Sequence, residues 1–389
     1  MSRKELTLSG RFVYGNEFEV KEGFIVIERG KIKEIGEDRI EAAVKGIIVP
    51  SFVNAHTHIG DSIAKEPDFM PLEQLVGPGG FKHKILTETP YDVLVSAMKG
   101  TIEDIFATGT QMFADFREGG VSGVTALTDA VGRVEASGKD KLSVRIFGRP
   151  GDGTEDYNRL FDSVEGIGVS SVANYEQEYL VRLVEAAKRN GKQFAIHAGE
   201  QNADDITGAI ELEPDFIVHL TKATQQDFQK MYDRNIDAVV CIRSNLVTGV
   251  GLPPLRQMFE SGLTVAAGTD NVMFNSPDIF SELEFISKLF PRLEAKEVLK
   301  LCTWNAAKVL QADESIGTIE EGKSANLLVI SEDTPNMSHV RNTVKAVVRR
   351  ATRSDLAAII HEGVTYSTFF DNSDSRFAAV SVKRTVKPP

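Results

Sequence analysis

Apolar and polar residues follow two different rhythms along the chain. Residues 5–49 alternate short β-prone runs with turn-forming residues, which is typical of a small β-sandwich and predicts no helix there. From Pro50 onward, apolar strand-like runs alternate with helical stripes, as in parallel βα units. After about residue 312, short strands and turns return, at 316–330 and 344–350. The pattern therefore predicts a parallel α/β domain between two β-rich segments.

The central region contains enough strands for a closed barrel. Eight strand candidates can be counted, at residues 54–58, 111–117, 144–150, 166–172, 194–200, 216–220, 238–242 and 264–270. Helical stripes lie between them, such as 89–109, which Thr89 and Pro90 open and Gly109 closes, and 179–191. Eight parallel strands, and a length close to the typical ~250 residues, predict an α/β fold with a (β/α)8 TIM barrel over residues 50–312.

Composition excludes several classes of partner. The chain is 42% hydrophobic and 26% charged, with a net charge of −12, which argues against nucleic acid or an anionic membrane surface as partner. It contains no run of about 18 apolar residues, and its first ten residues lack the hydrophobic region of a signal peptide. We therefore expect a cytoplasmic protein. Cys241 and Cys302 do not form a CxxC pair, so we expect both to be free, buried thiols.

Residues that can bind a metal ion end four of the strand candidates. They are His56, His58, His197, His219 and Asp270. Active sites of parallel barrels form at this edge, and His56 and His58, one residue apart, point to the same side of a strand. A lone histidine is more often an ordinary core or surface residue. Four of the 7 histidines of the chain, however, lie at strand ends in barrel order. Imidazole and carboxylate ligands favour zinc, with ferrous iron as the alternative.

These residues belong to motifs that resemble a known family. The motifs are NAHTH at 54–58, HAGE at 197–200, CIRSN at 241–245, GTDN at 268–271, TWNAA at 303–307 and GTIEEGKSANLLVI at 317–330. Together they resemble the amidohydrolase superfamily, in the branch of cytosine, adenosine and S-adenosylhomocysteine deaminases and related chlorohydrolases. The resemblance implies that residues 1–49 and 313–389 join into one discontinuous β-sandwich beside the barrel. Residues 382–389 show no pattern that would pack.

The resemblance also implies roles for individual residues. Glu200 follows His197 by three residues, and the matching glutamate in similar deaminases is a proton shuttle, not a ligand. Such a shuttle is chemically reasonable, because hydroxide attack on an amidine-like carbon needs the adjacent ring nitrogen protonated. A glutamate on a loop is otherwise most often a surface residue. Asp270 would bind the metal and accept a proton from water. His219 would hydrogen-bond to the hydroxide and need not be a full ligand.

A single divalent ion is expected. Relatives that bind two ions bridge them with a lysine or glutamate at the end of a middle strand. This chain has FGRP at 147–150 and VSSV at 169–172 there, without a lysine. Two departures from the family pattern, Ser51 for a common glycine and GTDN for GTDG or GTDS, remove no reactive atom but change the expected shape of the pocket.

Substrate-binding candidates lie on the loops that follow the strands. The long loop 59–89 contains Lys82 and His83, which could recognise an anionic or carbonyl group or could be solvated residues of a turn. Arg149 could bind a carboxylate or phosphate. Asn245 is a further candidate, although it could orient its loop instead. For Arg117, an ion pair with the adjacent Glu118 is the favoured interpretation.

The resemblance favours an enzyme that acts on a small molecule. The expected reaction is hydrolysis of a carbon–nitrogen bond other than a peptide bond, as deamination of a purine, pyrimidine, pterin or nucleoside. The alternatives are a chlorohydrolase or a cyclic-amide or imidazolone hydrolase on the same scaffold. A non-catalytic binding protein on this barrel would be expected to have lost ligands, and every ligand is present. The sequence leaves the oligomeric state open, although barrels of this family are often homo-oligomeric.

Overall fold

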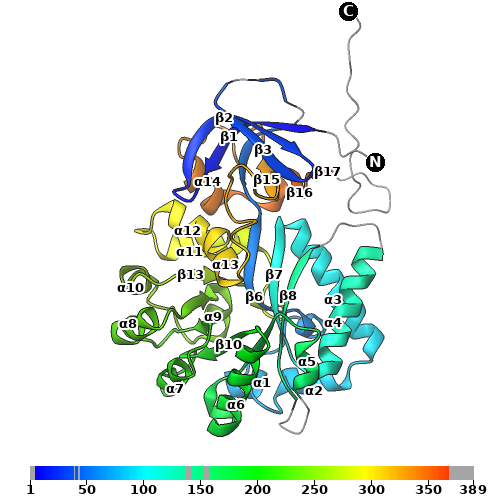
Figure 1. Ribbon diagram of the computed structural model, residues 1–389, viewed down its shortest axis with the longest axis vertical. Coiled ribbons are helices and arrows are strands. Elements are labelled where there is room, and N and C mark those ends of the chain that lie inside the picture. Colours follow the sequence, from blue (N-terminus) through cyan, green and yellow to red (C-terminus); the bar gives the residue numbers. More distant parts are fainter. Residues whose placement is uncertain (1–4, 39, 43, 137–141, 152–156, 368–389) are drawn as a thin grey trace, which may run out of the picture. The chain divides into compact units, whose positions relative to one another are not determined.

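The computed structural model describes residues 5–38, 40–42, 44–136, 142–151 and 157–367 of the 389-residue chain (Figure 1). The expectation about residues 382–389 lies outside this range. The chain divides into two compact units: unit 1 comprises residues 1–51 and 312–389, and unit 2 comprises residues 52–311. None of the helices within the described ranges is long and apolar enough to cross a membrane.

Unit 1 contains one sheet built from both ends of the chain. Its eight strands are β1 (Leu6–Tyr14), β2 (Glu19–Glu28), β3 (Lys31–Gly36), β4 (Val44–Lys45), β5 (Ile47–Pro50), β15 (Leu327–Ile330), β16 (Leu356–His361) and β17 (Val364–Ser367). The order is β17-β16-β15-β5-β1-β2-β3, and β4 pairs with β1. β5 joins the two halves, because it is parallel to β1 and antiparallel to β15.

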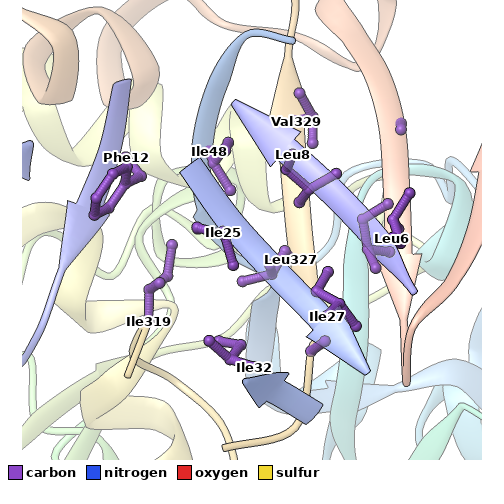
Figure 2. Close-up of a cluster of buried hydrophobic side chains, with 13 residues drawn as sticks. Leu6, Leu8, Phe12, Ile25, Ile27, Ile32, Ile48, Ile319, Leu327 and Val329 are labelled. Carbon is purple, nitrogen blue, oxygen red and sulfur yellow. The ribbon is translucent and has the colours of Figure 1, made fainter. Parts of the chain in front are cut away.

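The core of unit 1 explains why distant segments belong together. Leu8, Phe12 and Ile25 from the first strands pack in one buried cluster with Leu327 and Val329 of β15 (Figure 2). Each such side chain contributes about 1.5–3 kcal/mol when removed from water. Neither segment could bury these residues alone. The described strands form a single sheet, so a second layer, and with it the β-sandwich, stays a prediction.

The expectation of a strand over 344–350 is wrong. Residues Thr343–Arg350 form helix α14, followed by the short helix η3 (Arg353–Asp355). The side chain of Asn342 accepts a hydrogen bond from the backbone N–H of Lys345, which begins the helix. Val344, Val347 and Val348 are buried at a spacing of three and four residues, so the apolar pattern is that of a helix.

Unit 2 contains a curled sheet of parallel strands. These are β6 (Phe52–His58), β7 (Thr110–Arg117), β8 (Ser143–Gly148), β9 (Gly166–Val169), β10 (Gln193–Ala198), β11 (Phe216–His219), β12 (Asp237–Val240), β13 (Val265–Ala267) and β14 (Asp270–Asn271). The order is β13-β12-β11-β10-β9-β8-β7-β6-β14. β13 and β14 belong to one stretch, 265–271, which pairs with β12 at one end of this order and with β6 at the other. The prediction of a parallel, barrel-like sheet is confirmed.

Helices follow most of these strands. They are η1 (Ile59–Ala64), α1 (Leu72–Val76), α2 (Phe81–Glu88), α3 (Tyr91–Ala107), α4 (Gly120–Ala136), α5 (Asn158–Phe161), η2 (Val172–Asn174), α6 (Gln177–Arg189), α7 (Ile206–Glu211), α8 (Gln225–Asp233), α9 (Ile242–Thr248), α10 (Leu255–Glu260), α11 (Ile279–Leu289), α12 (Ala295–Leu301) and α13 (Trp304–Val309). The predicted helices at 89–109 and 179–191 correspond to α3 and α6. α3 packs on α4 and β7 (Figure 1). The expected loop 59–89 carries three short helices, so Lys82 and His83 lie on α2 and not in a turn.

A close backbone approach between residue 268 and β6 gives a testable constraint. A Cβ atom added at Gly268 would lie 2.6 Å from the backbone N and O of His56. Gly268→Ala should therefore lower the free energy of unfolding by about 1–3 kcal/mol, the usual effect of overpacking. Denaturant unfolding followed by circular dichroism measures this.

Gly100→Ala is the matched control. Gly100 lies inside α3, and a Cβ atom there would meet no atom within 4 Å. Because alanine favours a helix over glycine, this variant should be more stable by about 0.5–1 kcal/mol. An equal loss in both variants would contradict the close approach at Gly268.

Candidate metal centre

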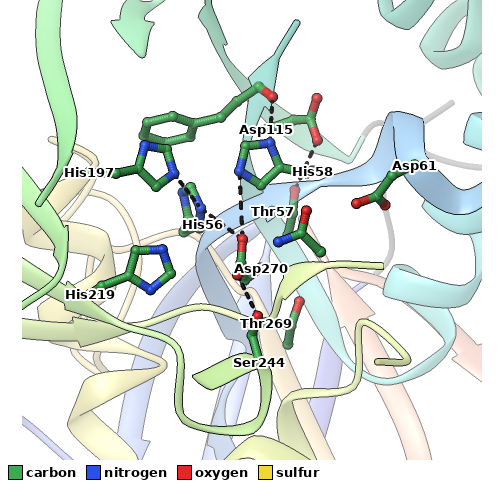
Figure 3. A network of polar contacts seen from close by, with 12 residues as sticks. His56, Thr57, His58, Asp61, Asp115, His197, His219, Ser244, Thr269 and Asp270 are labelled. Carbon is green, nitrogen blue, oxygen red and sulfur yellow. Dashed lines mark hydrogen bonds and ion pairs between the residues drawn. The ribbon is translucent and has the colours of Figure 1, made fainter. Parts of the chain in front are cut away.

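The end of β6 brings two histidines to one side of the strand. His56 and His58 are 0% and 4% exposed, and their ring centroids lie 4.8 Å apart. Thr57, between them, donates its hydroxyl hydrogen to the backbone oxygen of Ala114 on β7, at 2.9 Å. The alternation of a strand therefore gives the two imidazoles a common direction (Figure 3).

Two further strands complete the cluster. His197, on β10, has its Nε2 atom 3.3 Å from Nε2 of His56, and Oδ1 of Asp270, on β14, lies 3.2 Å from the same atom. Candidate ligand atoms of His56, His58 and His197 all lie within 4.8 Å of one another. Zinc–nitrogen bonds of about 2.0–2.1 Å in a tetrahedral site separate ligand atoms by about 3.4 Å. The spacing therefore fits a divalent transition-metal ion.

Outer hydrogen bonds orient three of the rings. Nδ1 of His58 donates to the backbone oxygen of Phe116 at 3.0 Å, and Nδ1 of His197 donates to that of Val169 at 2.8 Å. Nδ1 of His219, on β11, donates to Oδ1 of Asn245 at 3.1 Å. With the proton on Nδ1, each ring turns the lone pair of Nε2 inward, as metal-binding histidines require.

Burial sets the charge of these groups. It lowers the pKa of His58 to about 3, with the charge of Lys82 acting in the same direction. It also lowers the pKa of His56 and that of His197. Burial would raise the pKa of Asp270, but the hydrogen bond with His56 brings it well below its usual value. Neutral imidazoles beside an ionised carboxylate are the protonation states that metal binding needs.

The backbone at two strand ends is strained. His219 has a φ of 77° and Asp270 a φ of 58°, in the left-handed region that such residues rarely adopt. Ser244 donates a 2.5 Å hydrogen bond to Oδ2 of Asp270, which leaves Oδ1 facing the histidines. Asn54 braces the preceding residue, because its side chain bonds both Oγ1 and the backbone N–H of Thr269, at 2.8 and 3.1 Å. These contacts aim the carboxylate into the cluster.

A cavity of about 880 Å³ opens beside the cluster, and Glu200 lines it. Gly199 turns the chain at the end of β10 with a φ of 66°, and its N–H donates to Asp205 at 2.9 Å. Glu200 Oε2 then lies 3.6 Å from Nε2 of His219. Burial raises the pKa of Glu200 above its usual value, against the opposing influence of His219. A carboxyl group that exchanges protons near neutral pH would have this property.

The substrate-binding candidates occupy different places. Arg149 lines the cavity, and so does Lys82. His83 is half-buried on α2 and Asn245 is fully buried against His219, and neither is among the described lining residues. Arg117 forms the expected ion pair with Glu118, at 2.6 Å. Cys241 and Cys302 are free and buried, as expected.

Several residues around the cluster have contacts that were not expected from the sequence. Asn54 and Ser244 lie inside quoted motifs, and their polar side chains next to ligand positions were a usable signal. Lys82 and Glu118 form a 2.7 Å ion pair, and Lys82 also donates to Asn271 at 3.0 Å. No spacing rule relates Lys82 to Glu118, because the contact depends on how α2 folds back over the strand ends.

Comparison with known proteins identifies the family. Residues 47–371 match the amidohydrolase family. A putative aminohydrolase of Methanothermobacter thermautotrophicus is 33% identical, covering 86% of this chain and 94% of the relative. A 5-methylthioadenosine/S-adenosylhomocysteine deaminase of Thermoanaerobacter pseudethanolicus is 27% identical, covering 87% of each chain. The crystal structure of an atrazine chlorohydrolase from Arthrobacter aurescens complexed with zinc superimposes with a TM-score of 0.75 at 16% identity, covering 94% of this chain and 97% of that one. The chain therefore belongs to the amidohydrolase family, and it is a metal-dependent hydrolase of carbon–nitrogen bonds, as its motifs predict.

Proposed function

We propose that the protein deaminates a nitrogen heterocycle by hydrolysis, with one divalent transition-metal ion bound by His56, His58, His197 and Asp270. The observation that carries the proposal is the cluster of inward-facing Nε2 atoms with Glu200 at the wall of the same cavity. Zinc fits the ligand types best, and ferrous iron is the alternative. When bound, such an ion supplies a hydroxide nucleophile at neutral pH by lowering the pKa of water to about 7.

Glu200 would move the protons. Attack on a carbon that bears an amino group needs a proton on the neighbouring ring nitrogen, and departure of ammonia needs a second transfer. Burial raises the pKa of Glu200, which makes its carboxyl group a better match for proton exchange with a heterocycle than an exposed glutamate would be. Glu200 Oε2 lies 3.6 Å from Nε2 of His219, and both residues line the cavity, so both would reach a substrate bound beside them.

His219 and Asp270 would orient the attacking water. Asn245 keeps the proton of His219 on Nδ1, so Nε2 can accept a hydrogen bond at the cavity. Asp270 has Oδ2 occupied by Ser244, while Oδ1 faces the cluster and can accept a proton. Asn245, proposed from the sequence as a substrate contact, would on this geometry act through His219.

The cavity supports a substrate of nucleobase or nucleoside size. Its volume of about 880 Å³ lies within the usual range for small-molecule sites, ~300–1,000 Å³. Arg149 is the basic residue on its wall whose Nε has no hydrogen-bond partner among the described residues, so it can bind a carbonyl or anionic group. Relatives named as adenosine-type deaminases favour an aminopurine derivative within the wider set of purines, pyrimidines, pterins and nucleosides.

The architecture proposed for this activity has two parts. The stretch 265–271, which pairs with β12 and with β6, supports a closed (β/α)8 barrel as the catalytic domain. The shared core of residues from both chain ends supports a discontinuous β-sandwich as the second domain. We also propose that the chain forms a homo-oligomer, as barrels of this family often do.

The proposed reaction predicts ammonia as product. Purified, zinc-loaded protein should release ammonia from at least one member of a panel of aminopurines, aminopyrimidines, pterins and their nucleosides, as measured with a coupled glutamate dehydrogenase assay. Chlorotriazines and cyclic amides form the comparison set. Release of chloride, or ring opening without ammonia, would favour the alternative hydrolases on the same scaffold.

The ligand set predicts metal content. Elemental analysis should find close to one transition-metal ion per chain, because three imidazoles and one carboxylate form one site. His56→Ala removes a buried ligand and should lose both metal and activity. Two ions per chain at full occupancy would overturn the single-ion proposal.

Substitution of Glu200 separates proton transfer from metal binding. Glu200→Gln keeps the shape of the side chain but cannot titrate, so turnover should fall by at least ~10²–10⁴ while metal content stays at the wild-type level. Asp270→Asn should lower both turnover and metal content. Glu213→Gln, the same change at a glutamate that is 59% exposed, is the control and should leave both unchanged. Near-normal turnover of Glu200→Gln on a confirmed substrate would rule out this residue as the shuttle.

A further inference from the structure

One buried carboxylate contacts the metal cluster from outside. Glu118 follows the end of β7 and is 6% exposed. Its Oε1 lies 2.8 Å from Nδ1 of His58 and 2.7 Å from Nζ of Lys82, and its Oε2 accepts a 2.6 Å hydrogen bond from Arg117. Three donors from three different elements therefore converge on one carboxylate.

Glu118 distinguishes His58 from the other oriented histidines. His197 donates to a backbone carbonyl and His219 to an amide oxygen, both of which are neutral acceptors. Nδ1 of His58 instead lies between the backbone oxygen of Phe116, at 3.0 Å, and the carboxylate of Glu118. A carboxylate on the outer nitrogen makes imidazole a stronger donor to a cation and fixes its orientation more firmly.

The two cations explain how Glu118 stays charged without solvent. A buried carboxylate is unfavourable alone and takes up a proton unless it is paired. Lys82, on α2, is 3% exposed, and Arg117, at the end of β7, is 1% exposed. Both cations bond directly to the carboxylate, at 2.7 and 2.6 Å, and so compensate its negative charge. Arg117 bonds to Oε2, so it still holds the carboxylate when Lys82 is removed.

We propose that Glu118 is a positioning residue for the metal ligand His58, held from its other oxygen by Arg117. The proposal rests on the proposed function, since it takes His58 as a ligand. Glu118 lines the cavity, but both of its carboxylate oxygens are occupied by His58, Lys82 and Arg117. It acts through Nδ1 of His58, so its contribution belongs to metal affinity and ligand geometry.

The rival interpretation is a structural ion pair. Lys82 also donates to Asn271 at 3.0 Å, so its contacts tie α2 to the ends of β7 and β14. If this tie were the whole function of the pair, removing either partner would have the same consequences. The two partners can therefore be separated by experiment, because only one of them touches a histidine of the cluster.

Two substitutions break the Glu118–Lys82 ion pair, one by removing its negative charge and the other by removing its positive charge. Glu118→Gln removes the carboxylate and keeps its shape, and zinc affinity should fall by about 10–100-fold. Lys82→Met keeps the carboxylate on His58 and removes a positive charge near a cation site, so zinc should bind at least as tightly as in the wild type. Lys84→Met, at an exposed lysine of the same helix, is the control and should not change affinity.

Apo-protein titrated with zinc against a chromophoric chelator gives the affinities, and thermal unfolding of the apo-proteins reports loss of the ion pair separately. Glu118→Gln and Lys82→Met should both lower the unfolding temperature of the apo-protein. The visible spectrum of cobalt(II)-loaded protein should change in Glu118→Gln and stay unchanged in Lys82→Met, since it reports ligand geometry.

Wild-type affinity in Glu118→Gln, or an equal loss in Glu118→Gln and Lys82→Met, would overturn the positioning role. Should Glu118→Gln not fold, Glu118→Asp is the second variant. It keeps the charge but has a side chain shorter by one methylene group, so the carboxylate moves away from His58. Weakened zinc binding in that variant supports the proposal, and wild-type binding contradicts it. A wild-type protein that binds no transition metal would instead overturn the proposed function.

Discussion

The site depends on one unfavourable interaction, the crowding of two electron-rich atoms, the inner nitrogen of His197 and Oδ1 of Asp270, around Nε2 of His56 inside a dry interior. Nε2 of His56 and Nε2 of His197 lie 3.3 Å apart, and His56 is fully buried. Outer hydrogen bonds hold the proton of His197 on Nδ1, so its inner nitrogen presents a lone pair. Burial lowers the pKa of His56 and of His197, so protonation of a ring does not readily remove the repulsion. A divalent cation relieves the repulsion and matches the spacing, which is why this cluster is best understood as a ligand set.

The rest of the strand ends are arranged around that constraint. The left-handed backbone at His219 and at Asp270 is unfavourable by about 1–3 kcal/mol each, and it persists only where neighbouring contacts determine it. Ser244 and the Asn54–Thr269 pair supply such contacts for Asp270. Among the described residues, a positive φ at a non-glycine residue also occurs in turns away from the cluster, such as Phe18 in unit 1. At His219 and Asp270 the same conformation places a side chain in the cluster.

Local patterns carried most of the information about the fold and the ligands. The barrel-like sheet, α3 and α6 follow from strand and helix periodicity, and His56, His58, His197 and Asp270 follow from motifs at strand ends. The prediction at 344–350 was wrong because β-branched valines favour a strand by residue type, whereas the spacing of Val344, Val347 and Val348 is that of a helix. Contacts made across the fold had no sequence signal. Lys82 was weighed only together with its neighbour His83, and residue spacing cannot show which side of α2 faces the cavity.

Three buried carboxyl groups beside the cluster differ in pKa according to their distance from Lys82 and Arg117. Burial raises the pKa of Asp61 to about 8 and also raises that of Asp115, although Lys82 and Arg117 lie 3.8 and 3.6 Å from these carboxylates. The same two cations keep Glu118 ionised because they bond to it directly, at 2.7 and 2.6 Å. The shorter contacts therefore favour negative charge on Glu118 over Asp61 and Asp115, whose pKa values are raised. That charge lies on the carboxylate that contacts His58, and so the buried cations, which alone would repel a metal ion, direct negative charge to its ligand.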